Sequence, residues 1–298
     1  MKKLIVLLLA GFSIQAQSVL IADGSLLRSR GYCEPSISIN PKNPDNIVAG
    51  AVLNGVFYSE DGGQSWHADT LVSSFGVWGD PVLISDTAGH HYYLHLSDPT
   101  GENWASEEIL DRIVIQKSED GGKSWNNGSY TGSFHPKDQD KHWAVVDPNS
   151  NAIYVTWTQF DDYGSEEAKD ESNILFSKSL DGGETWSEAF AINQVPGNCL
   201  DGDSTSEGAV PAVGPDGTIY VTWANQNKLF FDKSSDGGET WLEEDLVIAD
   251  QPGGWDIDIP GVQRANGMPV TICDTLGNLY VNWVDDRNGN YDVWLIRS

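Results

Sequence analysis

An eight-residue phrase recurs four times in this chain and limits the folds that the chain can adopt. The phrase reads Ser-x-Asp-Gly-Gly-x-Ser/Thr-Trp, and its aspartates are separated by 59, 61 and 55 residues. The copies occupy residues 59–66, 118–125, 179–186 and 234–241. A literal repeat at this period predicts one supersecondary unit built several times, each unit burying its apolar face against the next.

Every position of the phrase suits a tight turn between two strands. Two successive glycines permit positive φ, and the aspartate can accept hydrogen bonds from backbone amides of the turn. The serine or threonine can bond back to the turn, and the tryptophan fills an apolar slot while its ring N–H needs a partner. A catalytic interpretation would require four identical active sites. We therefore predict a structural role for Asp61, Trp66, Asp120, Trp125, Asp181, Trp186, Asp236 and Trp241.

Short alternating apolar runs, separated by turns rich in Asp, Asn, Gly and Pro, surround each copy. This pattern is typical of β-hairpins. Five hairpins begin near Pro35, Pro81, Trp143, Pro211 and Pro269, and a third apolar run follows each of them. The phrase then turns the chain into a fourth strand, such as the run from Ala189. No helical periodicity lasts three turns, so we predict an all-β fold, a β-propeller of four-stranded antiparallel blades.

The fifth unit is shorter than the others. The final residues, DVWLIRS, match the third run of earlier units up to the serine that begins the phrase. We therefore expect five blades, the fifth without its last strand, in an intact fold of six. A longer chain would resume with an Asp-Gly-Gly turn; the alternative is that residues 18–22 return from the N-terminus to complete the fifth blade. We favour the first.

The N-terminus predicts export. Lys2 and Lys3 form a basic start, an apolar run follows, and Ala16 ends a small-residue cleavage site, so residues 1–16 read as a signal peptide of bacterial type. The propeller then spans residues 17–298, and we expect a secreted, cell-surface or periplasmic protein. No other run is apolar enough to cross a bilayer.

Charge and cysteine content exclude some classes of function. The formal net charge of −27 should repel nucleic acid and anionic lipid. The three cysteines, Cys33, Cys199 and Cys273, fit neither a metal motif nor a disulfide framework, and the sequence leaves their pairing open. We expect a monomer that needs no cofactor, with calcium as the one candidate ion.

The repeated phrase resembles the Asp-box, or bacterial neuraminidase repeat, over about residues 35 to 298. This resemblance implies the sialidase superfamily of β-propellers. Asp-boxes also occur in receptors, assembly factors and other glycosidases, so they identify architecture and not activity. The resemblance also implies a ligand site in a central funnel, on the face opposite the Asp-box turns. Residues before each inner strand and in each loop between second and third strands would line it.

These segments contain carboxylates, a few cations and aromatic residues, which suit sugar hydroxyls and acid/base chemistry. The candidate catalytic residues are Asp80, Asp140 and Glu207. The candidate substrate-binding residues are Arg30, Glu34, Trp104, Lys141, His142, Tyr163, Trp255, Arg264, Asp286 and Arg287. The simpler alternative is an acidic rim without a role, because exposed Asp and Glu are common on acidic proteins.

Two local features sharpen the functional prediction. A true sialidase carries an Arg-Ile-Pro motif on the first inner strand, but Cys33 stands where that arginine would be, so sialidase activity itself is not expected. Asp201, Asp203, Thr205 and Glu207 alternate as oxygen ligands and suggest a calcium site, with a capped surface turn as the alternative. We predict an exported, sialidase-like glycoside hydrolase acting on a glycan; the alternative is a non-catalytic propeller that binds glycan or protein.

Overall fold

A computed structural model describes residues 18–21, 33–262 and 265–298 of the chain. These residues form five antiparallel β-sheets, and their one helix is a short 3-10 turn, η2 (Asn103–Ala105). The prediction of an all-β fold is confirmed. The predicted signal peptide lies outside the described residues.

Four sheets have four strands and the fifth has three. The first sheet contains β1 (Ser36–Ile39), β2 (Ile47–Ala51), β3 (Gly55–Ser59) and β4 (His67–Thr70). The second contains β5 (Val82–Ser85), β6 (His91–Leu96), β7 (Ile113–Ser118) and β8 (Ser129–Thr131). The third contains β9 (Asp138–Val146), β10 (Ile153–Phe160), β11 (Ser172–Ser179) and β12 (Phe190–Ala191). The fourth contains β13 (Glu207–Val213), β14 (Ile219–Asn225), β15 (Lys228–Ser234) and β16 (Leu246–Asp250), and the fifth β17 (Val270–Cys273), β18 (Leu279–Asp285) and β19 (Asp292–Arg297).

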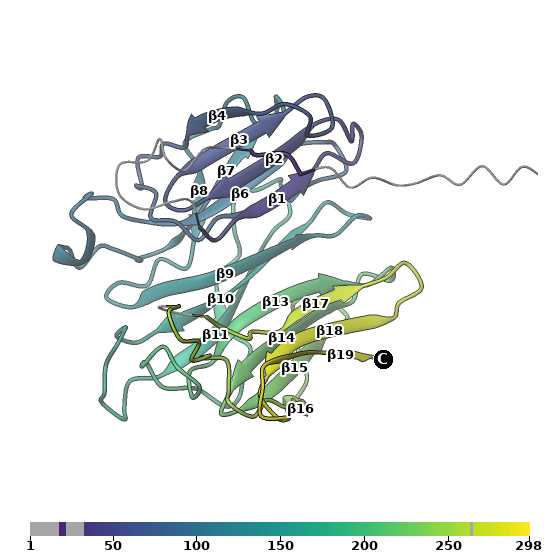
Figure 1. The fold of residues 1–298 in the computed structure, drawn as a ribbon. Coiled ribbons are helices and arrows are strands. Elements are labelled where there is room, and N and C mark those ends of the chain that lie inside the picture. Colours follow the sequence, from purple (N-terminus) through teal and green to yellow (C-terminus); the bar gives the residue numbers. More distant parts are fainter. Residues whose placement is uncertain (1–17, 22–32, 263–264) are drawn as a thin grey trace, which may run out of the picture.

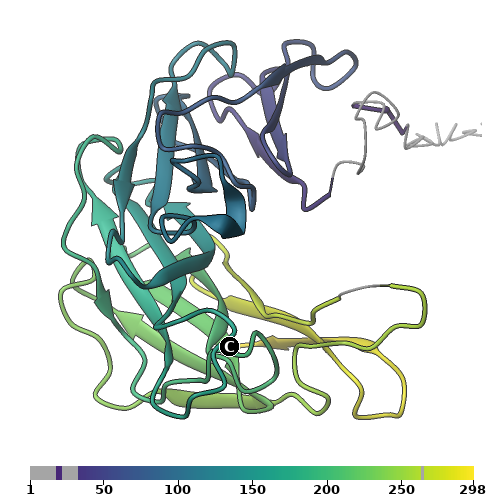
Figure 2. The same cartoon turned by 90° about the vertical axis from the view of Figure 1, so that its left-hand side faces the viewer.

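The five sheets follow one another around an open arc (Figures 1 and 2). In every sheet each strand pairs with its neighbours in the chain, and the first strands of successive sheets lie side by side. The first and fifth sheets stand at the two ends of the arc (Figure 2). This arrangement brings the starts of β1, β5, β9, β13 and β17 together, which matters for the site described below.

The apolar core lies between successive sheets. One cluster joins Tyr92 and Leu94 of the second sheet to Val155 and Trp157 of the third, and similar clusters join the other neighbouring pairs. Because each sheet covers the next, a single sheet would leave its apolar face in water and would not be stable alone.

Two details of strand prediction need correction. The fourth strand of the third sheet is only Phe190–Ala191, shorter than the apolar run from Ala189 suggests, because the chain leaves the ladder after two paired residues. Residues 18–21 do not complete the fifth sheet: they form no strand, and Ile21 packs instead on the first sheet against Ala49 and Phe57.

The repeated phrase forms the turn between third and fourth strands. In the third copy, Asp181 Oδ1 accepts hydrogen bonds from the backbone N–H of Glu184 (3.1 Å) and Thr185 (2.9 Å), and Oδ2 accepts one from the Thr185 hydroxyl (2.6 Å). The Thr185 hydroxyl and backbone, with smaller contributions from other donors, lower the pKa of Asp181 to about 2. The charged carboxylate therefore holds the turn more strongly than the protonated form would.

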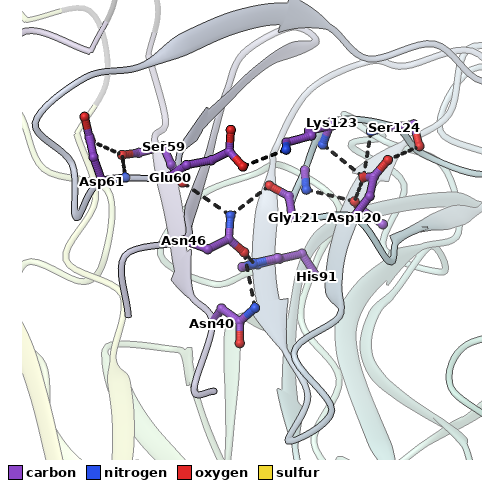
Figure 3. Close-up of polar contacts among 12 residues, drawn as sticks. Asn40, Asn46, Ser59, Glu60, Asp61, His91, Asp120, Gly121, Lys123 and Ser124 are labelled. Carbon is purple, nitrogen blue, oxygen red and sulfur yellow. Dashed lines mark hydrogen bonds and ion pairs between the residues drawn. The ribbon is translucent and has the colours of Figure 1, made fainter. Parts of the chain in front are cut away.

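The turns also contact the preceding sheet (Figure 3). The Asn46 side chain of the first sheet donates to the carbonyl oxygen of Gly121 in the second copy (3.0 Å), and Lys123 pairs with Glu60 across the same boundary (2.6 Å). The phrase thus shapes one turn and helps to join two sheets.

We expect Asp181→Asn to lower the melting temperature at pH 7, because the charged acceptor of four donors is lost: the Ser179 and Thr185 hydroxyls and the backbone N–H groups of Glu184 and Thr185. A carboxylate with a lowered pKa stabilises the fold above its unfolded pKa of about 4, and this stabilisation disappears as pH falls through about 2. The difference between variant and wild type should therefore shrink from pH 4 downward. Glu184→Gln, which removes the same charge from the same turn, is the control for thermal unfolding followed by circular dichroism.

Candidate functional site

The strand registers define one equivalent position in all five sheets. It is the residue two places before Ser36, Val82, Trp143, Val210 and Val270. Pairing begins at Ser36, Val82 and Val270 in their strands, and it resumes at Trp143 and Val210 after the bulges of β9 and β13. The five residues are Glu34, Asp80, Lys141, Gly208 and Met268. Because the first strands lie side by side, this position places three charged side chains around one centre.

The backbone at this position is unusual. Glu34, Asp80 and Lys141 have φ of 49°, 50° and 48°, in the left-handed region that costs non-glycine residues roughly 1–2 kcal/mol each. In β9 this residue lies in a β-bulge opposite Trp157, so Lys141 and His142 together face one residue of β10. Strained residues and bulges are frequent at functional sites, where they redirect a side chain.

Gly208 shows why the fourth sheet departs from the charged pattern. Its φ is 75°, and a Cβ atom there would lie 2.8 Å from the side chain of Met268. We expect Gly208→Ala to lower the free energy of unfolding by about 1–3 kcal/mol, from the left-handed backbone and the displaced methionine. Gly202→Ala, where a Cβ would meet nothing within 4 Å, is the matched control in urea unfolding.

An ion-pair triad joins the first three sheets. Lys141 Nζ lies 2.8 Å from Asp80 Oδ2 and 3.7 Å from Glu34 Oε1. The lysine side chain is only 15% exposed, whereas Glu34 is half-exposed. The triad stands over a cavity of about 530 Å³ whose other walls include His142, Trp143 and Met268.

The two aspartates beside Lys141 have opposite pKa shifts. Burial acts to raise the pKa of Asp80, but the positive charge of Lys141 and the hydrogen bonds that Asp80 shares with Glu34 and Lys141 outweigh burial and lower it. Burial raises the pKa of Asp140 to about 7, opposed by the charge of Lys141 and reinforced by that of Asp80. Asp80 is therefore ionised near neutral pH, whereas Asp140 keeps its proton to a higher pH than an ordinary aspartate does.

The remaining titratable groups are held in single states. Burial acts to lower the pKa of Lys141, but the negative charges of Asp140, Asp80 and Glu34 raise it, so the lysine stays charged. Burial lowers the pKa of His142 to about 4, so its ring is neutral at pH 7. His142 is therefore a buried residue of the β9 bulge and not a base that titrates near neutrality.

An aromatic platform lies near the triad. Trp104, on η2, is 59% exposed and stacks on Tyr163, with ring centroids 5.6 Å apart and an interplanar angle of 27°. The Tyr163 hydroxyl donates to Asp201 (2.6 Å) and its backbone N–H to Asp138 at the start of β9 (2.9 Å), which fixes the ring. Trp78, two residues before Asp80, meets Trp104 edge-on. The sequence interpretation missed Trp78, although its position just before an inner strand is the signal that selected Asp80.

Several expected site residues are not among the residues that line the triad cavity, or lie outside the described part of the chain. Trp255 is not a stacking platform: it is 1% exposed and packs in the core between the fourth and fifth sheets. Glu207 lies at the bulge of β13 and is fully buried, and its catalytic role stays a prediction from sequence. Arg287 forms an ion pair with Asp285 and stacks on Trp294, and the neighbouring Asp286 packs near Gly253. Arg30 and Arg264 lie outside the described residues.

Three of the four residues expected to bind calcium have separate partners. Asp201 accepts from Tyr163, Asp203 accepts from the backbone N–H of Asp256 (2.8 Å), and Thr205 donates to Asn198 (3.0 Å). In the described part of the chain, no group of three or more His, Cys, Asp or Glu side chains is placed to hold a metal ion. Calcium binding therefore stays a prediction from sequence, and we derive no chemical step through a metal.

Comparison with known proteins supports the fold. The model of the BNR/Asp-box repeat matches residues 57–68, and no curated protein matches the sequence. A protein of unknown function from Dyadobacter fermentans has a TM-score of 0.60 and 15% identity, over 89% of this chain and 78% of its own. A leech intramolecular trans-sialidase has a TM-score of 0.53 and 14% identity, over 94% of this chain and 63% of its own.

A sialidase from Streptococcus pneumoniae has a TM-score of 0.53 and 12% identity, over 93% of this chain and 62% of its own. The chain thus spans little more than three fifths of either sialidase. At these identities the similarity concerns the fold. No helix among the described residues is long and apolar enough to cross a membrane. The repeat match and the structural neighbours together establish that this chain has a sialidase-like fold built with the BNR/Asp-box repeat.

Proposed function

We propose that the protein is a glycoside hydrolase whose active site is the cavity at the Glu34–Asp80–Lys141 triad. One observation carries the proposal: two carboxyl groups beside a single lysine have pKa values shifted in opposite directions. Glycoside hydrolysis uses such a pair, one protonated and one ionised. The left-handed backbone of the three triad residues and the similarity in fold to glycan-acting proteins support the same proposal.

Each carboxyl group has a distinct role in this proposal. Asp140, whose pKa is raised to about 7, donates a proton to the glycosidic oxygen as the sugar leaves. Asp80 stays ionised beside Lys141 and acts on the opposite side of the anomeric carbon, as nucleophile or as the base that activates water. Trp104, which meets Trp78 edge-on, offers its exposed ring to a sugar ring.

The test is turnover of a panel of aryl glycosides and polysaccharides by the purified protein, with the anomer formed first identified by NMR. Retention of configuration would indicate carboxyl groups about 5 Å apart, and inversion a separation of about 6.5–9.5 Å. Turnover of at least one uncharged glycoside supports the proposal. A folded protein that turns over none of the panel would contradict it.

A second candidate function is glycan binding without turnover, favoured by the exposed, fixed ring of Trp104. In that case Trp104→Ala should weaken binding on a glycan array by at least about tenfold, because stacking area is lost. Phe134→Ala removes an aromatic ring that is 36% exposed and lies outside the triad cavity, and it serves as the control. Equal binding by both variants would exclude the platform from recognition.

We also propose that a sixth sheet completes a closed propeller between the first and fifth sheets. Val270, Ile272, Val293 and Leu295 expose apolar side chains on one face of the fifth sheet, and Ile37 and Ile39 do so on β1. Large exposed apolar faces of this kind mark contact surfaces. An experimental structure of the natural protein should show a sheet covering both faces; a stable closed ring of five sheets would contradict the proposal.

We further propose that the protein is exported, that it is a monomer and that it does not bind nucleic acid. It rests on the basic and apolar N-terminal residues and on the formal charge of −27. N-terminal sequencing of protein recovered outside the cytoplasm should begin after Ala16. Size-exclusion chromatography with light scattering would report the oligomeric state.

A further inference from the structure

We infer that the Glu34–Asp80–Lys141 triad disfavours carboxylated sugars relative to their uncharged counterparts. This inference rests on the proposed function and narrows its substrate class. A site for carboxylated sugars needs a cation that the incoming carboxylate can pair with. Among the described residues that line the cavity, Lys141 is the one permanent cation, and His142 is a buried neighbour.

The charge of Lys141 is already paired. Its Nζ contacts Asp80 at 2.8 Å and Glu34 at 3.7 Å, so two carboxylates share one ammonium group. The lysine and Asp80 side chains are 15% and 18% exposed, whereas Glu34 is 51% exposed. An incoming ligand therefore meets a carboxylate before it meets the lysine. The carboxylate of a ligand and the carboxylate of Glu34 would repel each other strongly where water is partly excluded.

The arginines of the second and fifth sheets do not supply a free cation either. Arg112 pairs with Asp111 and its guanidinium lies 4.6 Å from the ring centre of Tyr130. Arg287 pairs with Asp285 and lies 4.2 Å from the ring centre of Trp294. Both guanidinium groups are held by a carboxylate and an aromatic face of their own surroundings.

The test uses pairs of ligands in which a carboxylate replaces a neutral group. Isothermal titration at low ionic strength would compare glucoside with glucuronide, galactoside with galacturonide, and oligogalacturonate with its methyl ester. We expect the uncharged member of the pairs that bind to bind at least about tenfold more tightly. The difference should shrink as salt is added, because screening weakens repulsion between exposed charges.

Two variants connect the selectivity to the triad. Glu34→Gln, and the double variant Glu34→Gln with Asp80→Asn, uncover the charge of Lys141 while keeping side-chain size. The ratio of uncharged to carboxylated affinity should fall by at least about tenfold in the double variant. Glu60→Gln is the control: it also removes one carboxylate paired with a lysine, Lys123 at 2.6 Å, but at the Asp-box end of the sheets (Figure 3).

The outcomes separate the inference from the function on which it rests. The inference is supported if the wild type binds the uncharged ligands more tightly, and if this preference falls in the triad variants but not in Glu60→Gln. Equal or tighter binding of the carboxylated members by the wild type would overturn it and leave the glycan function standing. The same ratio in the double variant as in Glu60→Gln would also overturn it, and binding of no sugar at all would overturn the proposed function.

Discussion

Replacing Asp140 with asparagine is expected to reduce kcat/KM for the best glycoside by about 10²–10⁴-fold, the usual contribution of a general acid. Asparagine keeps the size of the side chain and the carbonyl oxygen that accepts the backbone N–H of Lys141 (2.7 Å), but it holds no proton to donate. A loss of this size in a folded variant would identify a chemical role for the residue.

The pH dependence gives this prediction a second readout. The pKa of Asp140 is raised to about 7, and only the protonated form is an acid, so wild-type activity should fall as pH rises through about 7. Residual activity of Asp140→Asn should lack that limb between pH 5 and 9. The stability of the wild type should also fall as pH rises, because a buried carboxyl group with a raised pKa disfavours the fold once it ionises. Asp140→Asn should therefore be at least as stable as the wild type at pH 8.

Asp162→Asn is the control, because Asp162 is an exposed carboxylate of a neighbouring loop. It should keep both the activity and the alkaline limb. If Asp140→Asn retained more than about a tenth of wild-type kcat/KM, or kept the same pH profile, Asp140 would not be the acid and Asp138, whose pKa is also raised by burial, would be examined next.

The fold could be predicted from local chemistry because the same turn occurs four times. The Asp-Gly-Gly turn depends on positive φ and on backbone amides only a few residues away, so its structure follows from short-range sequence. Strand lengths were predicted less well from the sequence. Phe190–Ala191 is short because tertiary packing, and not β-propensity, decides where a ladder ends.

The site could be predicted only in part. Asp80 and Lys141 were selected by their place before inner strands, but their contact joins residues 61 positions apart and depends on how two sheets pack. Trp255 was misjudged because an aromatic residue in a Gly-rich loop has the same local sequence whether the loop opens to solvent or folds over the core. Aligning the five hairpins by register would have revealed the triad, since its members share one position.

Lys141→Met should have the largest effect on stability among the triad variants, lowering the free energy of unfolding by about 3–5 kcal/mol at pH 7. Methionine has nearly the length of the aliphatic part of lysine, but it leaves Asp80 and Asp140 buried without their counter-charge. Removing one partner of a buried ion pair costs more than the pair contributes, because the remaining charge stays in a medium of low dielectric constant. Urea unfolding followed by tryptophan fluorescence would measure the loss.

The same substitution should change the chemistry in a way that a purely structural role would not. The charge of Lys141 lowers the pKa of both Asp80 and Asp140, so its removal raises both and moves the alkaline limb of the activity profile to higher pH. Lys141 is thus a positioning residue that keeps one carboxyl group ionised while its neighbour holds a proton. Part of the lost stability should return as pH falls, because protonating the two carboxyl groups removes their unpaired charge.

Lys123→Met provides the matched comparison. Lys123 also bridges the first and second sheets through a carboxylate, with its Nζ 2.6 Å from Glu60, but both side chains are about half-exposed. Exposed pairs contribute little, so this variant should unfold almost like wild type and keep its pH profile. Similar losses in the two variants would mean that bridging sheets, and not burial beneath two carboxylates, explains Lys141. If only Lys141→Met lost much of its free energy of unfolding and also shifted the alkaline limb of the activity profile, Lys141 would contribute both to stability and to acid–base function.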